Sequence, residues 1–398
     1  MDAIRHHTFG PPEVLVLEQV PDPVPGPGQV LVDAVAHGVH LLDTALRRGD
    51  TDAPLPLPSL PAVPGREVAG TVSDVGPGVD PAWRGRLVAA HLGPVPDGGG
   101  YARRVVTGVG TLHTLDGDAP LEPASAVALV GTGRTAVYTL DVAEIAADDV
   151  VVVTAAAGGL GSLFVQEALH VGARVVALAG GQTKLAALRG LVAGPGRDGR
   201  APGPGHVDRH EPAGRDGSAP PDADRLALVD YSVDGWERAA RAALGGERAT
   251  VVLDGVGGEL GTAATALLTA RHAPGQAPHD APAPGAAPGH TAEAPAGASR
   301  PGRLITYGWA SGAPNRYTSW AGDDRIRPAD GERGFEVRYV VGPDAPPMDD
   351  PRAYQQRAIA HAASGRWRVA THRVPLAEAA RAHRELEERR TVGKVVLV

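Results

Sequence analysis

The chain has 398 residues, 43% of them hydrophobic, which is enough for a sizeable core and roughly two to three domains. Its formal net charge of −8 argues against a general nucleic-acid-binding surface, and the absence of cysteine excludes disulfides, thiol nucleophiles and thiolate-ligated metal centres. No stretch approaches the ~18 apolar residues of a membrane span, and the N-terminus has no apolar signal core. We therefore expect a cytoplasmic protein that binds neither membranes nor nucleic acid.

The N-terminal part of the chain consists of short β-rich runs separated by Pro/Gly turns. Examples are Val30–Ala36, Val68–Val75 and Arg86–Ala90. This spacing predicts a compact, largely antiparallel β domain.

From Val150 onwards, strands alternate with helices. Six strand candidates follow one another, at Val150–Thr154, Arg174–Ala179, Leu226–Val229, Thr250–Asp254, Arg303–Tyr307 and Glu336–Val341. Helical segments separate several of them, at about 160–170, 184–190, 236–244 and 260–269. The pattern predicts an α/β fold with a doubly wound parallel sheet. The tail has a strand at Val369–Val374, a helix at Leu376–Glu388 and a strand at Lys394–Val398, and we expect it to return to the N-terminal β domain.

Two segments, residues 192–224 and 271–299, are rich in Gly, Pro and Ala and lack apolar periodicity. Such segments cannot bury enough surface to offset the entropy of ordering them. We interpret both as disordered surface insertions in helix-to-strand connections, which the fold does not need.

A glycine-rich turn joins the first strand of the α/β region to its helix. In the segment Ala155–Ser162, Ala156 takes the first position of a GxGxxG pattern, Gly158 the second and Gly161 the third. A strand precedes this turn, and a helix and a second strand follow it, which is the context that dinucleotide binding requires. The motif therefore predicts a dinucleotide site.

Several ordered motifs, taken together, resemble one known family. They include FGPPEVL at 9–15, PGREVAG at 64–70, AAAGGLGS at 155–162, VLDGVGG at 252–258, GRLI at 302–305 and VGKV at 392–395. With these motifs the chain resembles the medium-chain dehydrogenase/reductase superfamily, in its zinc-free quinone oxidoreductase (zeta-crystallin-like) branch. The resemblance implies a GroES-like catalytic domain at 1–122, a Rossmann NADP-binding domain at 123–364 and a return to the catalytic domain at 365–398.

The resemblance also implies an activity. We expect an NADPH-dependent, zinc-independent oxidoreductase that reduces a small quinone or α,β-unsaturated carbonyl compound by hydride transfer, and a homodimer paired through Phe335–Val341. Two alternatives stay open. One is an enoyl reductase acting on a carrier- or CoA-tethered intermediate, and the other is a non-catalytic NADPH-binding protein with a structural or regulatory role.

Cofactor-binding positions follow from the matched motifs. They are Thr135, Ala157, Gly158, Gly159, Leu160, Gly161, Lys184, Tyr231, Val256, Tyr307, Gly308 and Trp309. Lys184 and Tyr231 match the lysine and tyrosine that contact the 2′-phosphate of NADPH in relatives. The second strand ends without a carboxylate, whereas NAD-preferring domains place one there to bind the ribose. The expected cofactor is therefore NADP.

The candidate catalytic residues are His40 and Asp43, in a loop that the resemblance places beneath the nicotinamide. His40 stands where the family usually has Asn, so it either transfers a proton or only replaces the Asn hydrogen bond. Asp43 is expected to anchor the loop. Zinc-dependent relatives carry Cys near His40 and His at Arg66, so we expect no zinc here. Trp309, Tyr317 and Trp320 either line a flat substrate or anchor an irregular loop.

Overall fold

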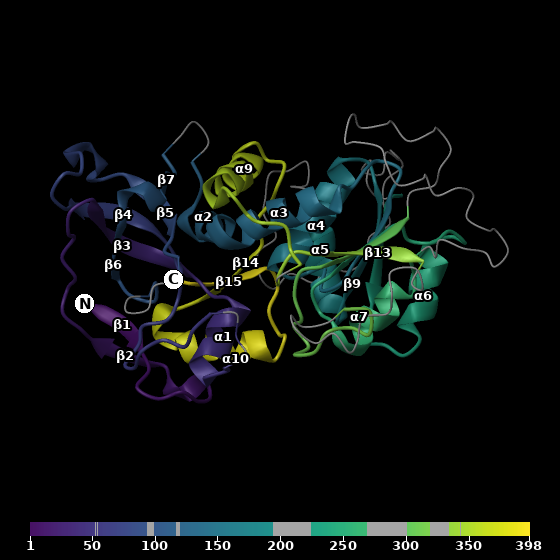
Figure 1. The fold of residues 1–398 in the computed structure, drawn as a ribbon, viewed down its shortest axis with the longest axis horizontal. Helices are drawn as coiled ribbons and strands as arrows, with labels where there is room; N and C mark the ends of the chain where they lie inside the picture. Colours follow the sequence, from purple (N-terminus) through teal and green to yellow (C-terminus); the bar gives the residue numbers. More distant parts are fainter. Residues whose placement is uncertain are drawn as a thin grey trace, which may run out of the picture.

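The structure, a computed structural model, describes residues 1–51, 53, 55–93, 99–116, 120–193, 224–268, 301–318, 334–342 and 344–398. Figure 1 shows two lobes, one built mainly from the N-terminal part of the chain and the other from its middle, with the C-terminal segment lying against the first. The predicted insertions fall almost entirely outside the described residues. The described chain stops at the end of helix α5 (Gln182–Ala193) and after helix α7 (Gly258–Thr265), and resumes close to the next strand.

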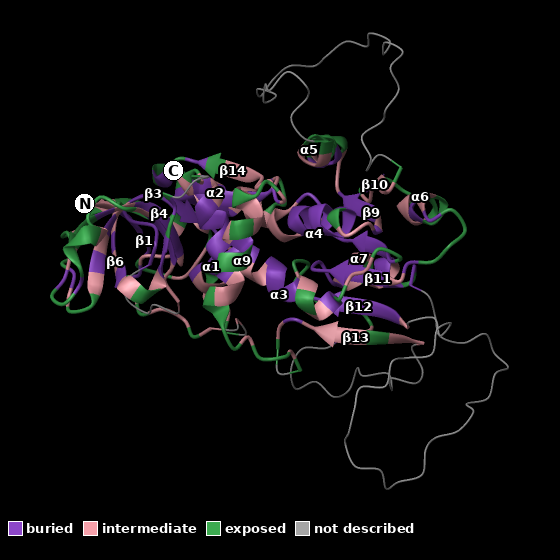
Figure 2. Ribbon diagram, turned by 90° about the horizontal axis from the view of Figure 1, so that it is seen from above, coloured by how far each residue is buried: buried purple, intermediate pink, exposed green. Residues whose placement is uncertain are grey.

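The second lobe contains a six-stranded parallel sheet. Its strands are β8 (Val150–Val153), β9 (Arg174–Ala179), β10 (Leu226–Asp230), β11 (Val251–Asp254), β12 (Gly302–Thr306) and β13 (Phe335–Tyr339). They are ordered β10-β9-β8-β11-β12-β13, the doubly wound order of dinucleotide-binding folds. The predicted α/β fold class is confirmed, and each strand lies within two residues of its predicted bounds at each end. Figure 2 shows β13 at one edge, less buried than its neighbour β12.

Alternate residues of these strands face opposite layers of helices. Val151 and Val153 belong to a core shared with α4 (Gly159–His170) and α5, whereas Val150 and Val152 belong to a core shared with α6 (Trp236–Ala243) and α7. Because both faces are covered, the strand Val150–Val153 is an unbroken buried run of valine.

The first lobe contains a seven-stranded sheet that combines both ends of the chain. It holds β3 (Gln29–Gly38), β4 (Glu67–Val75), β5 (Leu87–His91), β6 (Arg104–Gly108), β7 (Leu112–Thr114), β14 (Thr371–Val374) and β15 (Lys394–Leu397). A two-stranded ribbon, β1 (Asp2–Arg5) and β2 (Val16–Gln19), lies beside it. Strand β15 pairs with the end of β3, opposite His37 and Gly38. This pairing places Lys394 beside the segment that carries His40.

The segment predicted as a loop around Asp43 is instead the start of a helix, α1 (Leu41–Arg48), with His40 as its N-cap. The Asp43 carboxylate accepts a hydrogen bond of 2.8 Å from the backbone N–H of His40 and so closes the first turn. Helix α10 (Ala379–Glu387) packs on α1, and the Arg47 guanidinium lies 2.6 Å from the Glu387 carboxylate. Arg47 and Arg48 both pair with Glu387 and are thus structural cations.

Three further helices join the lobes: α2 (Pro123–Ala128), α3 (Arg134–Ala143) and α9 (Pro351–Ala363). Between α2 and α3 the chain forms a π-helical turn at Leu129–Gly133, and all five of its residues are buried. Such turns are rare and concentrate at functional sites. In the part of the chain that the structure describes, no helix is both long and apolar enough to cross a bilayer.

Candidate active site

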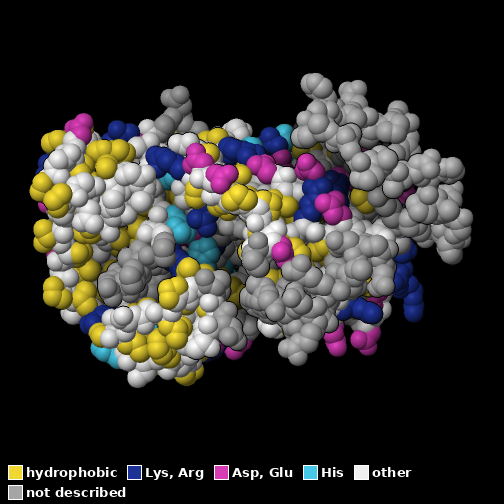
Figure 3. Space-filling model, viewed as in Figure 1, with side chains coloured by type: hydrophobic (Ala, Val, Ile, Leu, Met, Phe, Trp, Pro, Cys, Tyr) yellow, Lys and Arg dark blue, Asp and Glu magenta, His cyan; other side chains and the backbone are white. Residues whose placement is uncertain are grey.

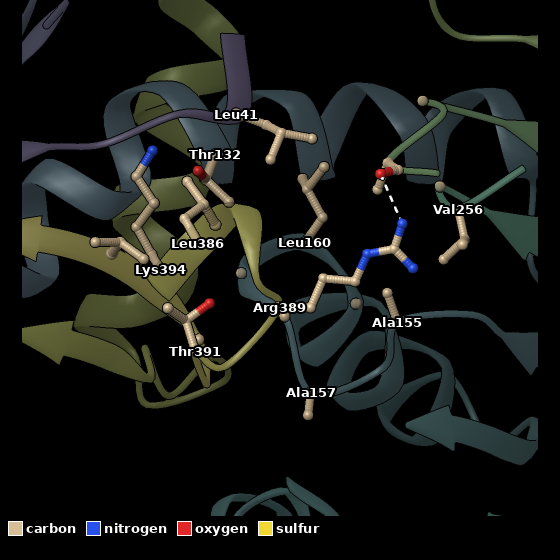
Figure 4. A pocket seen from close by; sticks show the side chains of 18 of the residues that line it. Leu41, Thr132, Ala155, Ala157, Leu160, Val256, Leu386, Arg389, Thr391 and Lys394 are labelled. Carbon is tan, nitrogen blue, oxygen red and sulfur yellow. Dashed lines mark hydrogen bonds between the residues drawn. The ribbon is translucent and has the colours of Figure 1, made fainter. Parts of the chain in front are cut away.

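A pocket of about 370 Å³ lies between the lobes, at the carboxyl ends of the parallel strands. The loops after β8, β9, β10, β11 and β12 line it, together with Val39–Leu41 and the C-terminal segment from Leu386 to Val395. In open α/β sheets this is the edge at which ligands bind. Figure 4 shows the two ends of the pocket, with Lys394, Thr132 and Leu41 at one and Arg389, Ala155 and Val256 at the other.

The glycine-rich turn forms the floor of this pocket. A Cβ at Gly161 would lie 2.4 Å from the carbonyl oxygen of Ala155 and 2.8 Å from the Cα of Ala156, so only glycine fits there. Helix α4 begins directly after Gly158 and has no side-chain cap, which leaves the N–H groups of its first turn open to a ligand. The arrangement fits the pyrophosphate of a dinucleotide.

Lys184, Tyr231 and Arg389 form a basic corner at the far end of the pocket. The Lys184 ammonium donates a hydrogen bond to the backbone carbonyl of Arg389, and burial, followed by the charge of Arg389, lowers the pKa of Lys184. The Arg389 guanidinium crosses the pocket and donates a hydrogen bond of 3.1 Å to the carbonyl of Ala310 (Figure 4). Two cations at one corner suit a phosphate group.

Sequence reasoning missed two features of this corner. Arg389 lies nine residues from the last one and has φ of 57°, and the motifs gave no signal for it. Asp230, at the end of β10, accepts a hydrogen bond of 2.8 Å from the N–H of Gly181. A carboxylate therefore stands beside the end of the second strand after all, although it comes from the neighbouring strand. Its contacts with Gly181, Gln182 and Ser232 hold the turn, and Asp230 does not line the pocket.

Most of the predicted cofactor residues line the pocket: Ala157, Gly158, Gly159, Leu160, Gly161, Lys184, Tyr231, Val256, Tyr307, Gly308 and Trp309. Thr135 does not line it, and Thr132, one turn earlier, takes that place. Tyr317 packs on Phe335 with ring centroids 5.3 Å apart and does not line the pocket either. Trp320 lies outside the described residues.

The opposite end of the pocket holds a cluster of three ionisable groups. His40 Nε2 lies 2.7 Å from Oε1 of Glu67 and 2.8 Å from Nζ of Lys394, and Lys394 Nζ lies 3.1 Å from Oε2 of Glu67. The side chains of Glu67 and Lys394 are 0% and 5% exposed, whereas that of His40 is 26% exposed. His40 therefore has the most exposed side chain of the three, and both His40 and Lys394 line the pocket.

Two glycines make room for the Glu67 carboxylate. A Cβ at Gly38 would lie 1.9 Å from Oε2, and a Cβ at Gly131, in the π-helical turn, would lie 1.5 Å from Oε1. Any side chain at either position would displace the carboxylate. The sequence signal for Glu67 was present in the PGREVAG motif, but its partner Lys394 is 327 residues away, and only the fold brings them together.

The charges of neighbouring groups and burial together set the pKa values of the ionisable side chains at this end of the pocket. Burial favours a raised pKa for the Glu67 carboxyl, but His40 and Lys394 outweigh it and hold that pKa far below its usual range. Burial lowers the pKa of Lys394, against the charge of Glu67. Nearby His91 has its pKa lowered to about 4 by burial, so it is neutral at pH 7. A buried carboxylate thus stabilises a cation beside His40.

Asp43 lies outside this pocket. It is 3% exposed, its carboxylate accepts a hydrogen bond of 3.2 Å from the Tyr101 hydroxyl, and Arg66 lies 3.6 Å away. Together with the bond to the N–H of His40, these contacts make Asp43 an anchor for the His40 backbone.

Comparisons with known proteins agree with this geometry. Residues 26–117 match the alcohol dehydrogenase GroES-like domain, and residues 222–397 match the zinc-binding dehydrogenase family. These matches confirm the resemblance to the medium-chain dehydrogenase/reductase superfamily that the motifs predicted. Within it, the relatives named below are quinone oxidoreductases and a 2-haloacrylate reductase.

The 2-haloacrylate reductase of a Burkholderia species is 35% identical over 186 residues, which are 46% of this chain and 55% of the relative. The quinone oxidoreductase of Sus scrofa is 32% identical over 183 residues, or 45% and 53% of the two chains. The chain therefore spans about half the length of the curated relatives it matches.

Solved structures match over the whole length. A mycobacterial protein complexed with NADPH has a TM-score of 0.66 at 28% identity, with 100% of both chains covered. The quinone oxidoreductase of Pseudomonas syringae has a TM-score of 0.69 at 24% identity, with 100% of this chain and 99% of the other covered. The second of these similarities concerns the fold alone.

The donor set around His40 does not fit the zinc named in one matching family. Zinc needs three or four neutral or anionic ligands, yet the Lys394 ammonium lies against both His40 and Glu67. No group of three or more His, Asp or Glu side chains with metal-binding geometry occurs among the described residues.

Proposed function

We propose that this protein is an NADPH-dependent, metal-independent reductase of a small quinone or α,β-unsaturated carbonyl compound. The observation that carries the proposal is a single pocket with a glycine-bounded turn in the middle, two cations at one end and the His40–Glu67–Lys394 cluster at the other. The names of the relatives, quinone oxidoreductase and 2-haloacrylate reductase, support the same chemistry. The cofactor in a 28% identical structure, NADPH, supports the choice of cofactor.

The residues that line the pocket fit the phosphate groups of NADPH. Gly158–Gly161 and the open N-terminus of α4 would hold the pyrophosphate, and Lys184, Tyr231 and Arg389 would hold the 2′-phosphate. Thr132, Val256 and Trp309 would flank the nicotinamide end. When bound, NADPH supplies the hydride that the reduction needs.

His40 supplies the proton in this proposal. It is the partly exposed member of its cluster, and its Nε2 faces a carboxylate acceptor and an ammonium donor at once. A proton that leaves the imidazole for the substrate is replaced at Nε2 by one from the Lys394 ammonium, and the cluster, which is then one proton short with Glu67 still ionised, takes up a proton from solvent before the next turnover. Asp43 fixes the backbone of His40, so the ring is presented at a defined place.

The proposed proton-delivering residues and most of the proposed cofactor-binding residues come from different parts of the chain. This separation supports the proposed domain limits, a catalytic domain at 1–122 and 365–398 and a cofactor domain at 123–364. We further propose a homodimer paired through β13, which is the edge strand of its sheet and carries partly exposed Phe335, Val337 and Tyr339.

The test is NADPH oxidation by the purified protein against quinones, enones and enoyl thioesters, before and after treatment with a chelator. The proposal expects turnover of quinones or enones that the chelator leaves unchanged. Turnover of thioesters alone would identify an enoyl reductase of tethered intermediates instead. NADPH binding without turnover of any of these compounds would indicate a structural or regulatory role.

A further inference from the structure

The first lobe contains a second cavity, with a volume of about 140 Å³. Helix α1 lines it together with His6 and the segments 55–58 and 62–66. Among the described residues, none that lines this cavity also lines the pocket between the lobes. The mechanism proposed above uses only Asp43 from this lining, as the anchor of the His40 backbone. The reductase site therefore does not account for the cavity.

Two arginines in the lining carry hydrogen-bond donors without acceptors. The Arg66 guanidinium donates no hydrogen bond to any residue that the structure describes, and its ion pair with Asp43 is loose, with Nε 3.6 Å from Oδ1. The Arg47 side chain is 1% exposed, and its terminal nitrogens bond the Glu387 carboxylate. Its Nε, however, is buried and has no hydrogen-bond partner among the described residues. An unpaired buried donor costs free energy that a bound oxygen acceptor would recover, so both arginines favour a ligand with acceptor oxygens.

The protein itself supplies few acceptors to this cavity. Asp43 is the one carboxylate in the described lining, and its Oδ2 already accepts hydrogen bonds from the N–H of His40 and the hydroxyl of Tyr101. Burial lowers the pKa of His6, so its ring is neutral at pH 7 and adds no charge. A carboxylate on the ligand is the group that best matches a guanidinium with free donors.

The remaining lining is apolar and limits the size of the ligand. Leu46, Leu55, Leu57 and Val63 contribute side chains to it, together with prolines of the two lining segments. An apolar cavity of about 150 Å³ holds one benzene ring. The volume therefore fits a single ring beside the carboxylate.

We propose that this cavity is a second ligand site, separate from the pocket between the lobes, and that it takes a single-ring aromatic carboxylate. The carboxylate accepts hydrogen bonds from Arg66, and the ring packs against the leucines and prolines. This site goes beyond the proposed reductase function and does not depend on it. Because Asp43 both lines the cavity and holds the N–H of His40, a ligand here lies against the residue that positions His40.

Calorimetric titration of the full chain with benzoate tests the inference. Benzamide has the same shape without the charge, and acetate has the charge without the ring. We expect saturable binding of benzoate with a Kd below ~10 mM. The Kd values for benzamide and acetate should be at least about tenfold higher.

Four variants locate the site. Arg66→Met removes the charge, and Arg66→Lys keeps the charge but not the fork. Leu57→Glu leaves Arg66 in place but puts a negative charge into the apolar wall. Arg86→Met, which removes an exposed arginine paired with Asp116 in the same lobe, is the control.

We expect Arg66→Met to raise the Kd for benzoate by about ten- to a hundred-fold, the range of one charge-assisted hydrogen bond, with Arg66→Lys in between. Leu57→Glu should raise it at least about tenfold, and Arg86→Met should change it less than about threefold. If Arg66→Met does not fold, Arg66→Lys and Leu57→Glu decide.

A competition experiment separates this cavity from the pocket between the lobes. Figure 3 shows Lys or Arg and His side chains within the hollow between the lobes, so that hollow is an alternative site for an anionic probe. The titration is therefore repeated with NADPH in excess, and the Kd for benzoate should change less than about threefold.

Three results would overturn the inference: no saturable binding of benzoate, equal binding by the wild type and the Arg66 and Leu57 variants, or displacement of benzoate by NADPH. None of them bears on the reductase function, which the turnover assay tests. If NADPH itself does not bind, the reductase proposal fails, and the variants alone decide whether benzoate occupies this cavity.

Discussion

At the scale of single residues, the site depends on one buried carboxylate. Glu67 lies between two glycines and is compensated by Lys394 and His40, which come from opposite ends of the chain. Breaking a buried ion pair on one side is more damaging than removing both partners, because the remaining charge is left without compensation. A double-mutant cycle on Glu67 and Lys394 can therefore measure the energy of their interaction.

Glu67→Gln should destabilise the protein at pH 7 by ~3–5 kcal/mol, since it leaves the Lys394 ammonium buried alone. The double variant Glu67→Gln/Lys394→Met should recover part of that loss. Urea unfolding of wild type, the two single variants and the double variant measures this coupling. Additive losses would show that the two groups do not compensate each other.

The same carboxylate predicts a pH dependence. Its pKa is lowered in the folded state, so the stability it contributes is complete above the unfolded pKa of ~4.5 and is lost as the pH falls towards the folded value. The wild type should therefore lose more free energy of unfolding between pH 7 and pH 3 than Glu67→Gln does. Equal slopes for the two proteins would mean that Glu67 is not ionised in the folded state.

His40→Asn tests proton transfer, because Asn keeps a polar side chain at the N-cap of α1. If His40 delivers the proton, kcat for an enone should fall by ~10²–10⁴ while the affinity for NADPH stays unchanged. The solvent isotope effect on kcat should change as well. Retention of most of the activity would assign His40 to holding the segment and proton delivery to water.

At the scale of elements, the strand β8 and the turn before α4 form the proposed cofactor site. Gly161→Ala places a Cβ against the backbone of Ala155 and Ala156, so the turn must shift. We expect the Kd for NADPH to rise at least about tenfold, which is ~1.4 kcal/mol. Gly190→Ala in α5 is the control, because no atom lies near its Cβ. It should leave the Kd unchanged and stabilise the helix by ~0.5–1 kcal/mol. Equal Kd values for both variants would contradict the proposal that the glycine-rich turn binds NADPH.

The elements that could be predicted from the sequence are those with a distinct pattern. The strand at Val150–Val153 and the glycine turn have one, and both lie where the pattern placed them. Helix α2 has none, because Ala124, Ala126, Val127 and Ala128 are buried on several sides and leave no polar face to set a period.

Helix α1 was predicted as a loop because the resemblance to the family placed a loop there, although Leu42, Ala45 and Leu46 recur at helical spacing. Lys394 and Arg389 could not be predicted as site residues for another reason. Their contacts with His40, Glu67 and Ala310 depend on the pairing of β15 with β3, which no local motif encodes.

At the scale of the whole molecule, the pocket exists because the C-terminal segment crosses from one lobe to the other. Gly393 bridges to Gly158 of the cofactor turn, and its N–H donates a hydrogen bond of 2.8 Å to the carbonyl of Ala157. The next residue, Lys394, belongs to the cluster with His40 and Glu67. One short stretch of backbone thus ties the glycine-rich turn, our proposed cofactor site, to the residues that we propose deliver the proton.

We predict that the Gly/Pro-rich segments are not required for this arrangement. Replacing residues 194–223 with a short Gly/Ser linker should leave the Tm and the affinity for NADPH nearly unchanged, because α5 and β10 on either side keep their contacts with the sheet. Thermal unfolding of the full-length and shortened proteins measures this. A large fall in Tm would show that the segment packs on the core.

The most direct test of the central claim is the choice between NADPH and NADH, measured with Lys184→Ala. A charge-assisted hydrogen bond contributes about 1.5–3 kcal/mol, or roughly ten- to a hundred-fold in affinity. We predict that the wild type binds NADPH more tightly than NADH and that Lys184→Ala raises the Kd for NADPH by that factor while sparing NADH. A wild type that prefers NADH, or a variant that weakens both cofactors equally, would contradict the account.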